Sequence, residues 1–360
     1  MLRKLAEFFL LLGATTLATY YVPVGVKTVF YIALLALYFR SKNESLWLAF
    51  FLTISDGFWG YFNLYEAVIS VIPGLPPIEI AHLYIVLGAI KATRQPSPGP
   101  FFHDGFLKVF AVYILFLIAQ GYMLGLSPQL NVQFRMVKFV LPLLMFYSLP
   151  RLFRTEEDFQ GFFFYLFPMA FLALFAQVFT ISTGQAPSQF LGVYKKLWFT
   201  VDVSKGKNYR GFYSSATVLT CYFGAFYHLA RRGNYFHYLY LFAVLGACLL
   251  CVILSATRGW TLGFSFGLIL FLVFVLKLSL KRLATIGATG AVMVAALLML
   301  PIVKKQFDNA FNRFNTLEKL ASGDVTAGGT LSRLNERSPR VMDKWSEAPF
   351  TGWGFSDAFF

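Results

Sequence analysis

A cluster of basic residues near the end of the sequence has the residue types and spacing needed to bind phosphate. Arg333, Arg337, Arg340 and Lys344 follow one another at intervals of four, three and four residues. On a continuous helix these intervals place all four side chains on one face. Guanidinium groups hold phosphate oxygens through two parallel hydrogen bonds, so this face suits a pyrophosphate group. The alternative is a solvated helix that lies on anionic lipid head groups.

These residues fall in a stretch that the sequence predicts as a helix, from Ser332 to Trp345. Ser332 is a suitable N-cap, and Pro349 and Gly352 mark a point by which the helix must have ended. Pro339 lies inside this stretch and can divide the helix, because proline lacks the N–H that an interior position donates.

Two further arginines lie beside apolar runs. Arg258 occurs in Ser-Ala-Thr-Arg-Gly-Trp at 255–260, a very short connection between two such runs. A charged group costs about 2.5–3.5 kcal/mol at the bilayer centre and less near the interface, so Arg258 predicts a partner or a wet cavity. The alternative is an interfacial arginine that extends beside Trp260. Arg210 precedes Gly211 just before another apolar run, where glycine permits close approach of the backbone.

Three ionisable residues fall inside the apolar runs themselves, where such groups are functional candidates. Arg135 and Lys138 share one face of a run and are expected to extend an outer positive cavity. Asp56 lies in mid-run, and structural pairing and a functional role are equally open for it. The sequence contains no HExxH, no Walker loop and no Asp-x-Asp pair, so neither a metal-dependent nor a nucleotide-driven mechanism has support, and no metal or cofactor is predicted.

The surrounding sequence is too apolar for water to be its main solvent. Of 360 residues, 58% are hydrophobic and 13% are charged, compared with about 25% charged in soluble domains, and the mean hydropathy is +0.63. Apolar runs of about 20 residues recur and are continuous rather than alternating, which predicts transmembrane helices. The expected fold class is therefore an all-α polytopic helical bundle. Small-residue packing, and not a disulfide or zinc site, is expected for the cysteines, Cys221, Cys248 and Cys251.

About 11 spans are predicted, and 12 if the protein continues beyond this sequence. They are expected at residues 5–22, 26–39, 46–65, 78–90, 106–124, 132–149, 159–181, 214–230, 235–255, 260–277 and 283–303. The first run lacks a convincing cleavage site, so it is expected to be a span rather than a signal peptide.

Basic residues in alternate connections predict the orientation, because lysine and arginine in short loops are retained on the cytoplasmic side. The connections assigned to that side contain Arg3 and Lys4; Arg40 and Lys42; Lys91 and Arg94; Arg151 and Arg154; Arg231 and Arg232; and Lys277, Lys281 and Arg282. The intervening connections at 22–26, 63–77 and 125–132 contain no lysine or arginine. The N-terminus is therefore expected in the cytoplasm.

Two long connections, residues 182–213 and 304–360, fall on the outer side. Both are basic, and long loops translocate whatever their charge. The rule that predicts orientation therefore does not explain their basic residues, which contribute much of the formal net charge of +14. An anionic partner there is the simplest interpretation. The predicted domains are a transmembrane bundle at 1–303, which includes the outer loop 182–213, and a mainly helical outer cap at 304–360.

Three stretches together resemble the O-antigen ligase and O-antigen polymerase family of lipid-linked glycan transferases. Arg210-Gly211-Phe212 is similar to the family's Arg-x-x-Gly-type entry to a span, and Ser255 to Gly259 resembles its Ser-Arg-Gly turn. The third stretch resembles the Arg, Trp, Pro-x-x-Gly-x-Gly pattern of the family's large outer loop and contains Arg340 to Trp345, Pro349, Gly352 and Gly354. The resemblance covers about 182–360, and the first half matches only as a bundle of apolar spans.

The resemblance implies metal-independent glycosyl transfer at the outer face of a bacterial inner membrane, from an undecaprenyl-pyrophosphate-linked glycan. The acceptor is lipid A-core in a ligase and another lipid-linked repeat unit in a polymerase, and the sequence does not separate the two. Arg210, Arg258 and Arg340 would act as catalytic residues that stabilise the leaving pyrophosphate. The substrate-binding residues would be Arg333, Arg337, Lys344, Gly352, Gly354, Arg135 and Lys138. Membrane lipids are further expected partners, and nucleic acid is not.

The sequence departs from the family pattern at its end. Family members place a histidine, the suspected general base, soon after the glycine motif. Because the sequence ends at Phe360, this histidine is expected beyond it, or another residue supplies the base, with Glu336, Asp343 and Asp357 as poor substitutes.

A transporter or flippase for an anionic solute or lipid-linked glycan is the alternative function, with Asp56, Arg135 and Lys138 lining a pathway. Against it, the charges cluster outside rather than at the midplane, where transporter sites lie. A third alternative is a non-enzymatic scaffold whose basic loops bind anionic lipid.

Overall fold

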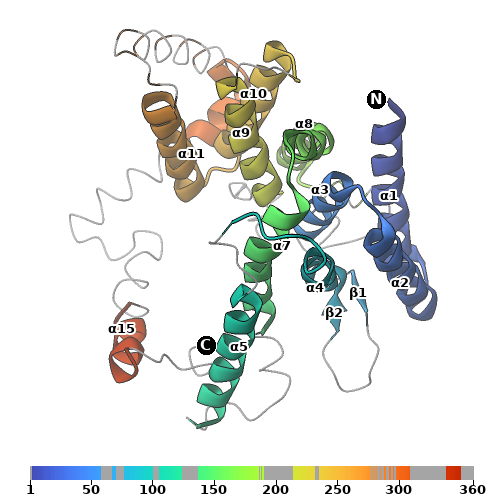
Figure 1. Ribbon diagram of the computed structural model, residues 1–360. Coiled ribbons are helices and arrows are strands. Elements are labelled where there is room, and N and C mark those ends of the chain that lie inside the picture. The colour runs from blue at the N-terminus through green and yellow to red at the C-terminus, as the bar shows by residue number, and fades with distance from the viewer. Residues whose placement is uncertain are drawn as a thin grey trace. The chain divides into compact units, whose positions relative to one another are not determined.

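The structure is a computed structural model, drawn in Figure 1. It describes residues 2–57, 67–69, 77–99, 105–123, 137–185, 187, 189, 214–231, 235–275, 297–308 and 338–349, with isolated positions between 277 and 295. These residues are helical apart from turns and one short pair of strands, which agrees with the predicted all-α class.

Most helices coincide with apolar runs of the sequence. They are α1 (Leu2–Tyr21), α2 (Val24–Arg40), α3 (Glu44–Ser55), α4 (Ile80–Ala92), α5 (Gly105–Met123), η3 (Leu141–Leu144), α7 (Met145–Leu152), α8 (Glu156–Thr183), α9 (Ser215–Ala230), α10 (Tyr238–Leu254), α11 (Arg258–Leu270), the π-helix η6 (Phe271–Val275) and the polar α15 (Ser338–Glu347). Within the described residues, α5 and α8 are long and apolar enough to cross a bilayer. Several others are shorter: α3, with 12 residues, rises only about 18 Å against a hydrocarbon core of about 30 Å. The predicted number of about 11 spans is therefore not confirmed.

Some predicted spans are interrupted. The prediction of one helix over 46–65 is wrong, because α3 ends at Ser55 and a turn follows in which Gly57 adopts a φ of 86°. Glycine has no Cβ and adopts this left-handed conformation without strain. The predicted span 78–90 begins as a strand, since β1 (Val68–Ile69) pairs antiparallel with β2 (Ile78–Glu79) before α4 starts at Ile80.

Three other predicted spans are also interrupted. The span predicted at 132–149 contains the 3₁₀ segment η3, with Pro142 at its start, and the helix then continues as α7. The span predicted at 260–277 changes from α11 into the π-helix η6, and the run at 283–303 contains a turn at 299–300.

The chain divides into two compact units. Unit 1 contains Met1–Leu12, Leu52–Asn63 and Gln160–Ser322, and unit 2 contains Gly13–Phe51, Leu64–Phe159 and Gly323–Phe360. The predicted division at residue 303 stays a prediction.

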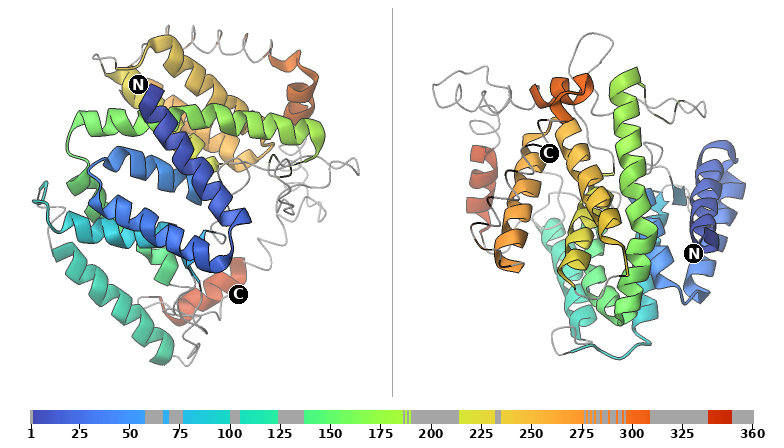
Figure 2. Two further views of the ribbon diagram at one scale, coloured as in Figure 1. Left: turned by 90° about the vertical axis from the view of Figure 1, so that its right-hand side faces the viewer. Right: turned by 90° about the horizontal axis from the view of Figure 1, so that it is seen from above.

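Unit 1 is built around the neighbouring helices α9, α10 and α11, which Figures 1 and 2 both draw next to one another. Many aromatic side chains are buried in its interior. One of them, Tyr222 of α9, donates a hydrogen bond from its hydroxyl to the carbonyl of Phe264 in α11 at 2.8 Å. The three cysteines are free and buried, as expected from small-residue packing, and the Sγ atom of Cys248 lies 3.5 Å from the carbonyl of Val218.

Unit 2 brings together three connections that the charge pattern assigns to one membrane side. The Nζ atom of Lys91, at the end of α4, contacts the carbonyl of Ser41 and the carboxylate of Glu44, at the start of α3. Arg154 donates to the carbonyl of Pro96 at 3.1 Å, and Ser45 donates to the carbonyl of Asp158 at 2.6 Å. These contacts agree with a common side for the connections at 40–45, 91–105 and 150–158, and which side is cytoplasmic stays a prediction.

The ion pair between Lys91 and Glu44 is largely buried, with side-chain exposures of 16% and 9%. Glu44 precedes the predicted span, and burial raises the pKa of its carboxyl although Lys91 opposes that shift. Removing one member of a buried pair leaves an uncompensated charge and costs about 3–5 kcal/mol. We therefore expect Lys91→Met to lower the thermal unfolding temperature of the purified protein by several degrees.

The double variant Lys91→Met/Glu44→Gln should recover most of that loss, because it removes both buried charges. Lys42→Met, at an exposed position in the same connection, is the control and should unfold like the wild type. A double variant as unstable as Lys91→Met would show that the pair does not act through charge compensation.

Candidate functional site

At one end of unit 1, the last turns of α8 and α10 lie beside the helical segment at 301–308. Ile181 near the end of α8, Leu254 at the end of α10, and Val303 form a buried apolar cluster. The loop 182–213 follows the first of these segments, and the stretch 304–360 follows the last. The predicted outer loop 182–213 therefore begins beside the segment that leads into the stretch 304–360.

The connection between α10 and α11 lies at the same end and is as short as the sequence predicts. Ser255 is fully buried, and its Oγ atom donates to the carbonyl of Val252 at 2.7 Å. The hydroxyls of Ser255 and Thr257 are 2.6 Å apart, and the backbone N–H of Thr257 donates to Ser255 Oγ at 3.3 Å. Ala256 between them adopts a φ of 49°. This left-handed position costs a residue with a Cβ about 1–2 kcal/mol, so the hydrogen bonds around it hold the turn in one geometry.

Arg258 is the first residue of α11, directly after this turn. A helix N-terminus carries unpaired N–H groups and a partial positive charge, and both favour anions. An ideal Cβ added to Gly259 would have no described atom within 4 Å, so the backbone of the first turn borders open space. The local backbone therefore combines an arginine, a helix N-terminus and room for close approach of a ligand.

The start of α9 is held by a residue from a distant part of the chain. The Oδ2 atom of Asp56 accepts a hydrogen bond from the backbone N–H of Thr217 at 2.6 Å, and Ser214 Oγ donates to the carbonyl of Gly57 at 3.3 Å. Structural pairing and a functional role are both open for Asp56 from the sequence, and this hydrogen bond to Thr217 is a structural pairing. The sequence could not reveal that partner, because 161 residues separate Asp56 from Thr217.

The basic helix predicted at 332–345 is described from Ser338 onward, as α15. Pro339 lies in the first described turn of α15, where a missing N–H costs nothing. Residues 332–337 lie outside the described part of the chain, so the division of the predicted helix at Pro339 stays a prediction. Arg340 and Lys344 are four residues apart and share a face, and Lys344 Nζ lies 2.9 Å from the carboxylate of Glu347. The helix has no buried residue, and the apolar side chains of Val341, Met342 and Trp345 are exposed.

Several predicted site residues lie outside the part of the chain that the structure describes. They are Arg210, Arg333, Arg337, Gly352, Gly354 and Arg135. The structure therefore places Arg258 by its backbone and places Arg340, Lys344 and Lys138 in full. Whether the arginines converge stays a prediction.

Lys138 has a partner that sequence reasoning missed. Its Nζ atom lies 3.3 Å from Glu79 Oε1 and 3.2 Å from the carbonyl of Pro77, and His82 Nδ1 lies 3.2 Å from the other oxygen of Glu79. Glu79 balances the charge that the sequence assigned to an outer positive cavity, so a substrate phosphate would compete with this pair for Lys138. Glu79 and Lys138 occupy the same predicted membrane side, which is the one signal that could have linked them.

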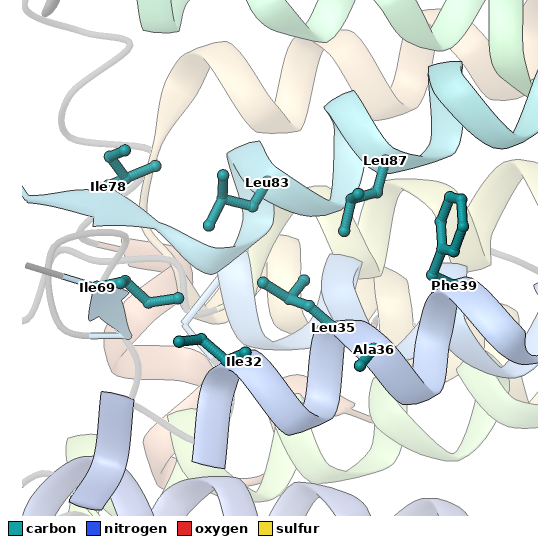
Figure 3. A pocket seen from close by; sticks show the side chains of 8 residues that line it. All are labelled: Ile32, Leu35, Ala36, Phe39, Ile69, Ile78, Leu83 and Leu87. Carbon is teal, nitrogen blue, oxygen red and sulfur yellow. The ribbon is translucent and has the colours of Figure 1, made fainter. Parts of the chain in front are cut away.

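An apolar pocket of about 430 Å³ lies in unit 2 between α2, α4 and the two strands, as Figure 3 shows. Its lining consists of Ile32, Leu35, Ala36, Phe39, Ile69, Ile78, Leu83 and Leu87. None of these side chains can transfer a proton or bind an anion, so the pocket suits a hydrocarbon chain and not a glycan. Over the described positions, no group of three or more His, Cys, Asp or Glu side chains could hold a metal ion.

These features define a helical protein of membrane type with a tight, hydrogen-bonded turn that sets an arginine at a helix N-terminus. The family model described as O-antigen ligase (Wzy_C) matches residues 241–360. The match includes the α10–α11 turn and α15, and it confirms the resemblance to the O-antigen ligase and polymerase family over the C-terminal third of the chain. No curated protein and no solved structure matches the chain.

Proposed function

We propose that the protein catalyses glycosyl transfer at the outer face of a bacterial inner membrane, with an undecaprenyl-pyrophosphate-linked glycan as donor. The acceptor is lipid A-core or a second lipid-linked repeat unit. The observation that carries the proposal is the family match over 241–360, which contains the turn with Arg258 at the start of α11.

In the proposed reaction a hydroxyl group of the acceptor attacks the anomeric carbon of the donor glycan. The new glycosidic C–O bond forms as the C–O bond to the pyrophosphate breaks, and undecaprenyl pyrophosphate leaves with the electron pair of that bond. The proton of the acceptor hydroxyl passes to a general base. Arg258 at the helix N-terminus, with Arg210 and Arg340, stabilises the negative charge on the leaving group. Each guanidinium carries five N–H donors, so the three arginines provide this stabilisation without a metal ion.

The transporter alternative has less support. Its proposed pathway used Asp56, Arg135 and Lys138. Two of these have partners of their own, because Asp56 accepts from the α9 backbone and Lys138 pairs with Glu79. Both contacts lie within one unit each and give these two groups a structural role.

The surface glycan of a strain that lacks this protein tests the proposal and separates ligase from polymerase. A ligase predicts that polymer accumulates on the lipid carrier and is absent from lipid A-core. A polymerase predicts that a single repeat unit reaches lipid A-core. Gel electrophoresis of lipopolysaccharide and of the lipid-linked fraction distinguishes these outcomes, and an unchanged glycan ladder would exclude both.

A further inference from the structure

The apolar pocket of unit 2 has one wall formed by a single face of α2. Its four lining residues on this helix, Ile32, Leu35, Ala36 and Phe39, follow one another at intervals of three, one and three. Side chains at this spacing share a helix face. The opposite wall comes from α4, and the paired strands β1 and β2 close the end beside Ile32 (Figure 3). Regular elements therefore hold the shape of this pocket, which we call the α2–α4 pocket.

The α2–α4 pocket opens at the surface of unit 2. Ile32 is 54% exposed, and Ala36, the smallest of the lining side chains, is also exposed. The stretch from Ile32 to Phe39 rises about 10 Å along α2, about a third of a hydrocarbon core of about 30 Å. Since α2 coincides with a predicted span, the medium at this opening is expected to be lipid, and a concave apolar surface there fits a hydrocarbon chain.

Two arginines lie at the Phe39 end of the pocket. The guanidinium carbon of Arg94 lies 5.5 Å from the centroid of the Phe39 ring. Arg40 is four residues after Ala36 on α2, so it continues the face that lines the pocket by one turn. Both arginines are exposed, and no carboxylate in the described part of the chain pairs with either. The apolar pocket thus ends at two guanidinium groups.

The connections that meet at this end carry an excess of positive charge. Residues 40–45 and 91–99 together contain four basic residues and one acid, Glu44. Lys91 contacts the carboxylate of Glu44, so this acid is already paired. The remaining positive charge attracts an anion to the end of the pocket at which the two arginines lie.

We propose that the α2–α4 pocket binds one acyl chain of an anionic phospholipid, whose phosphate group contacts Arg94 and Arg40. Guanidinium groups bind phosphate oxygens through paired hydrogen bonds, and basic pockets between helices on the cytoplasmic side bind anionic head groups. The charge pattern predicts that the connections at 40–45 and 91–99 lie on that side. A neutral lipid leaves the arginines without an anion, and a free phosphate leaves the apolar walls unfilled. The proposal does not depend on glycosyl transfer.

Binding should be measured on the full-length protein, purified in a nonionic detergent and depleted of lipid. Native mass spectrometry would compare phosphatidylglycerol with phosphatidylcholine of the same acyl chains. A phosphatidylglycerol with a photoreactive diazirine in one acyl chain would locate that chain by crosslinking. We expect tighter binding of phosphatidylglycerol, and crosslinks to the segments 32–39 and 83–87.

Arg94→Gln should weaken the binding of phosphatidylglycerol about fivefold, the contribution of one basic residue near an anionic lipid surface, and leave phosphatidylcholine unaffected. Arg231→Gln is the matched control. Arg231 is also an arginine beside an aromatic ring, 5.4 Å from the Tyr227 centroid, but it lies in unit 1 and not at this pocket.

Ala36→Phe should fill the pocket and reduce crosslinking at least about tenfold, because the added ring occupies the space of the acyl chain. Ala33→Phe introduces the same ring at another exposed position of α2 that does not line the pocket, and should stay within about twofold of the wild type. Thermal unfolding of all variants checks that they fold, and Arg94→Gln tests the site without any change inside the pocket.

Equal affinity for the two lipids would overturn the proposal, and so would wild-type binding in Arg94→Gln or wild-type crosslinking in folded Ala36→Phe. Two competitors test the other occupants. Displacement of the lipid by glycerol phosphate at equal concentration would show a phosphate site that does not use the pocket. Displacement by undecaprenyl phosphate at equal concentration would show a polyisoprenoid site. Either result would contradict a site for an anionic phospholipid.

Discussion

Arg258→Ala is expected to abolish surface-glycan assembly while the protein still inserts into the membrane in normal amounts. Arg258 begins α11 directly after a turn whose geometry is held by Ser255 and Thr257, so the substitution leaves the backbone that presents it intact. Removing one preorganised donor that stabilises developing negative charge costs about 100- to 1,000-fold in kcat. The glycan ladder and the amount of protein in the membrane fraction are the two measurements.

Arg258→Lys should recover only part of the activity, because lysine keeps the charge but lacks the planar guanidinium that binds phosphate through two hydrogen bonds. Arg231→Ala provides the control, since Arg231 directly follows the C-terminal end of α9 and contacts the hydroxyl of Tyr227. A normal ladder in Arg258→Ala would remove Arg258 from the catalytic residues.

Gly224→Ala is expected to destabilise the protein through the packing of α8 against α9. An ideal Cβ at Gly224 would lie 2.0 Å from the Cε1 atom of Phe163, far inside van der Waals contact. The Phe163 ring cannot simply move aside, because it is buried and packs against Phe167 and His228 at ring-centroid distances of 5.2 and 5.3 Å. Overpacking of this kind costs about 1–3 kcal/mol, which thermal unfolding of the purified protein would detect as a lower Tm.

Gly246→Ala on α10 is the matched control, because an added Cβ there meets no described atom within 4 Å. Phe163→Leu should restore part of the stability in the Gly224→Ala background by removing the ring edge that collides. If Gly224→Ala and Gly246→Ala unfold at the same temperature as the wild type, the close approach of α8 and α9 is wrong.

Local features of the sequence were sufficient to predict many element positions. The apolar runs at 5–22, 26–39 and 106–124 coincide with α1, α2 and α5 within a few residues. The very short α10–α11 connection follows from the small distance between two apolar runs. The contacts of Lys91 and Arg154 also agree with the charge pattern, which placed their connections on one side.

Interruptions within apolar runs were not predictable from hydropathy alone. The turn at Asp56-Gly57 and the strand pair that begins at Val68 both occur where the apolar pattern is continuous or ambiguous. Each of these strands has only two residues, which is too short to show the alternation of apolar and polar residues that predicts a strand from sequence.

The candidate site was predictable in its residue types and not in its partners. Arg258 stood out because a charged residue so close to apolar runs needs a reason. The cap from Asp56 to Thr217 and the pair between Glu79 and Lys138 join residues separated by 161 and 59 positions. Such contacts depend on how helices pack, and one sequence contains no periodic signal for them.

The most direct test of the proposed glycosyl transfer is a reaction with purified protein in nanodiscs, with EDTA present throughout. The substrates are a synthetic undecaprenyl-pyrophosphate-linked oligosaccharide with lipid A-core, or that oligosaccharide alone. Mass spectrometry would follow the glycan product and the released undecaprenyl pyrophosphate. We predict that both form in equal amounts with the wild type and fall at least about 100-fold with Arg258→Ala. Intact donor after prolonged incubation with folded wild-type protein, with either acceptor, would contradict the proposed glycosyl transfer.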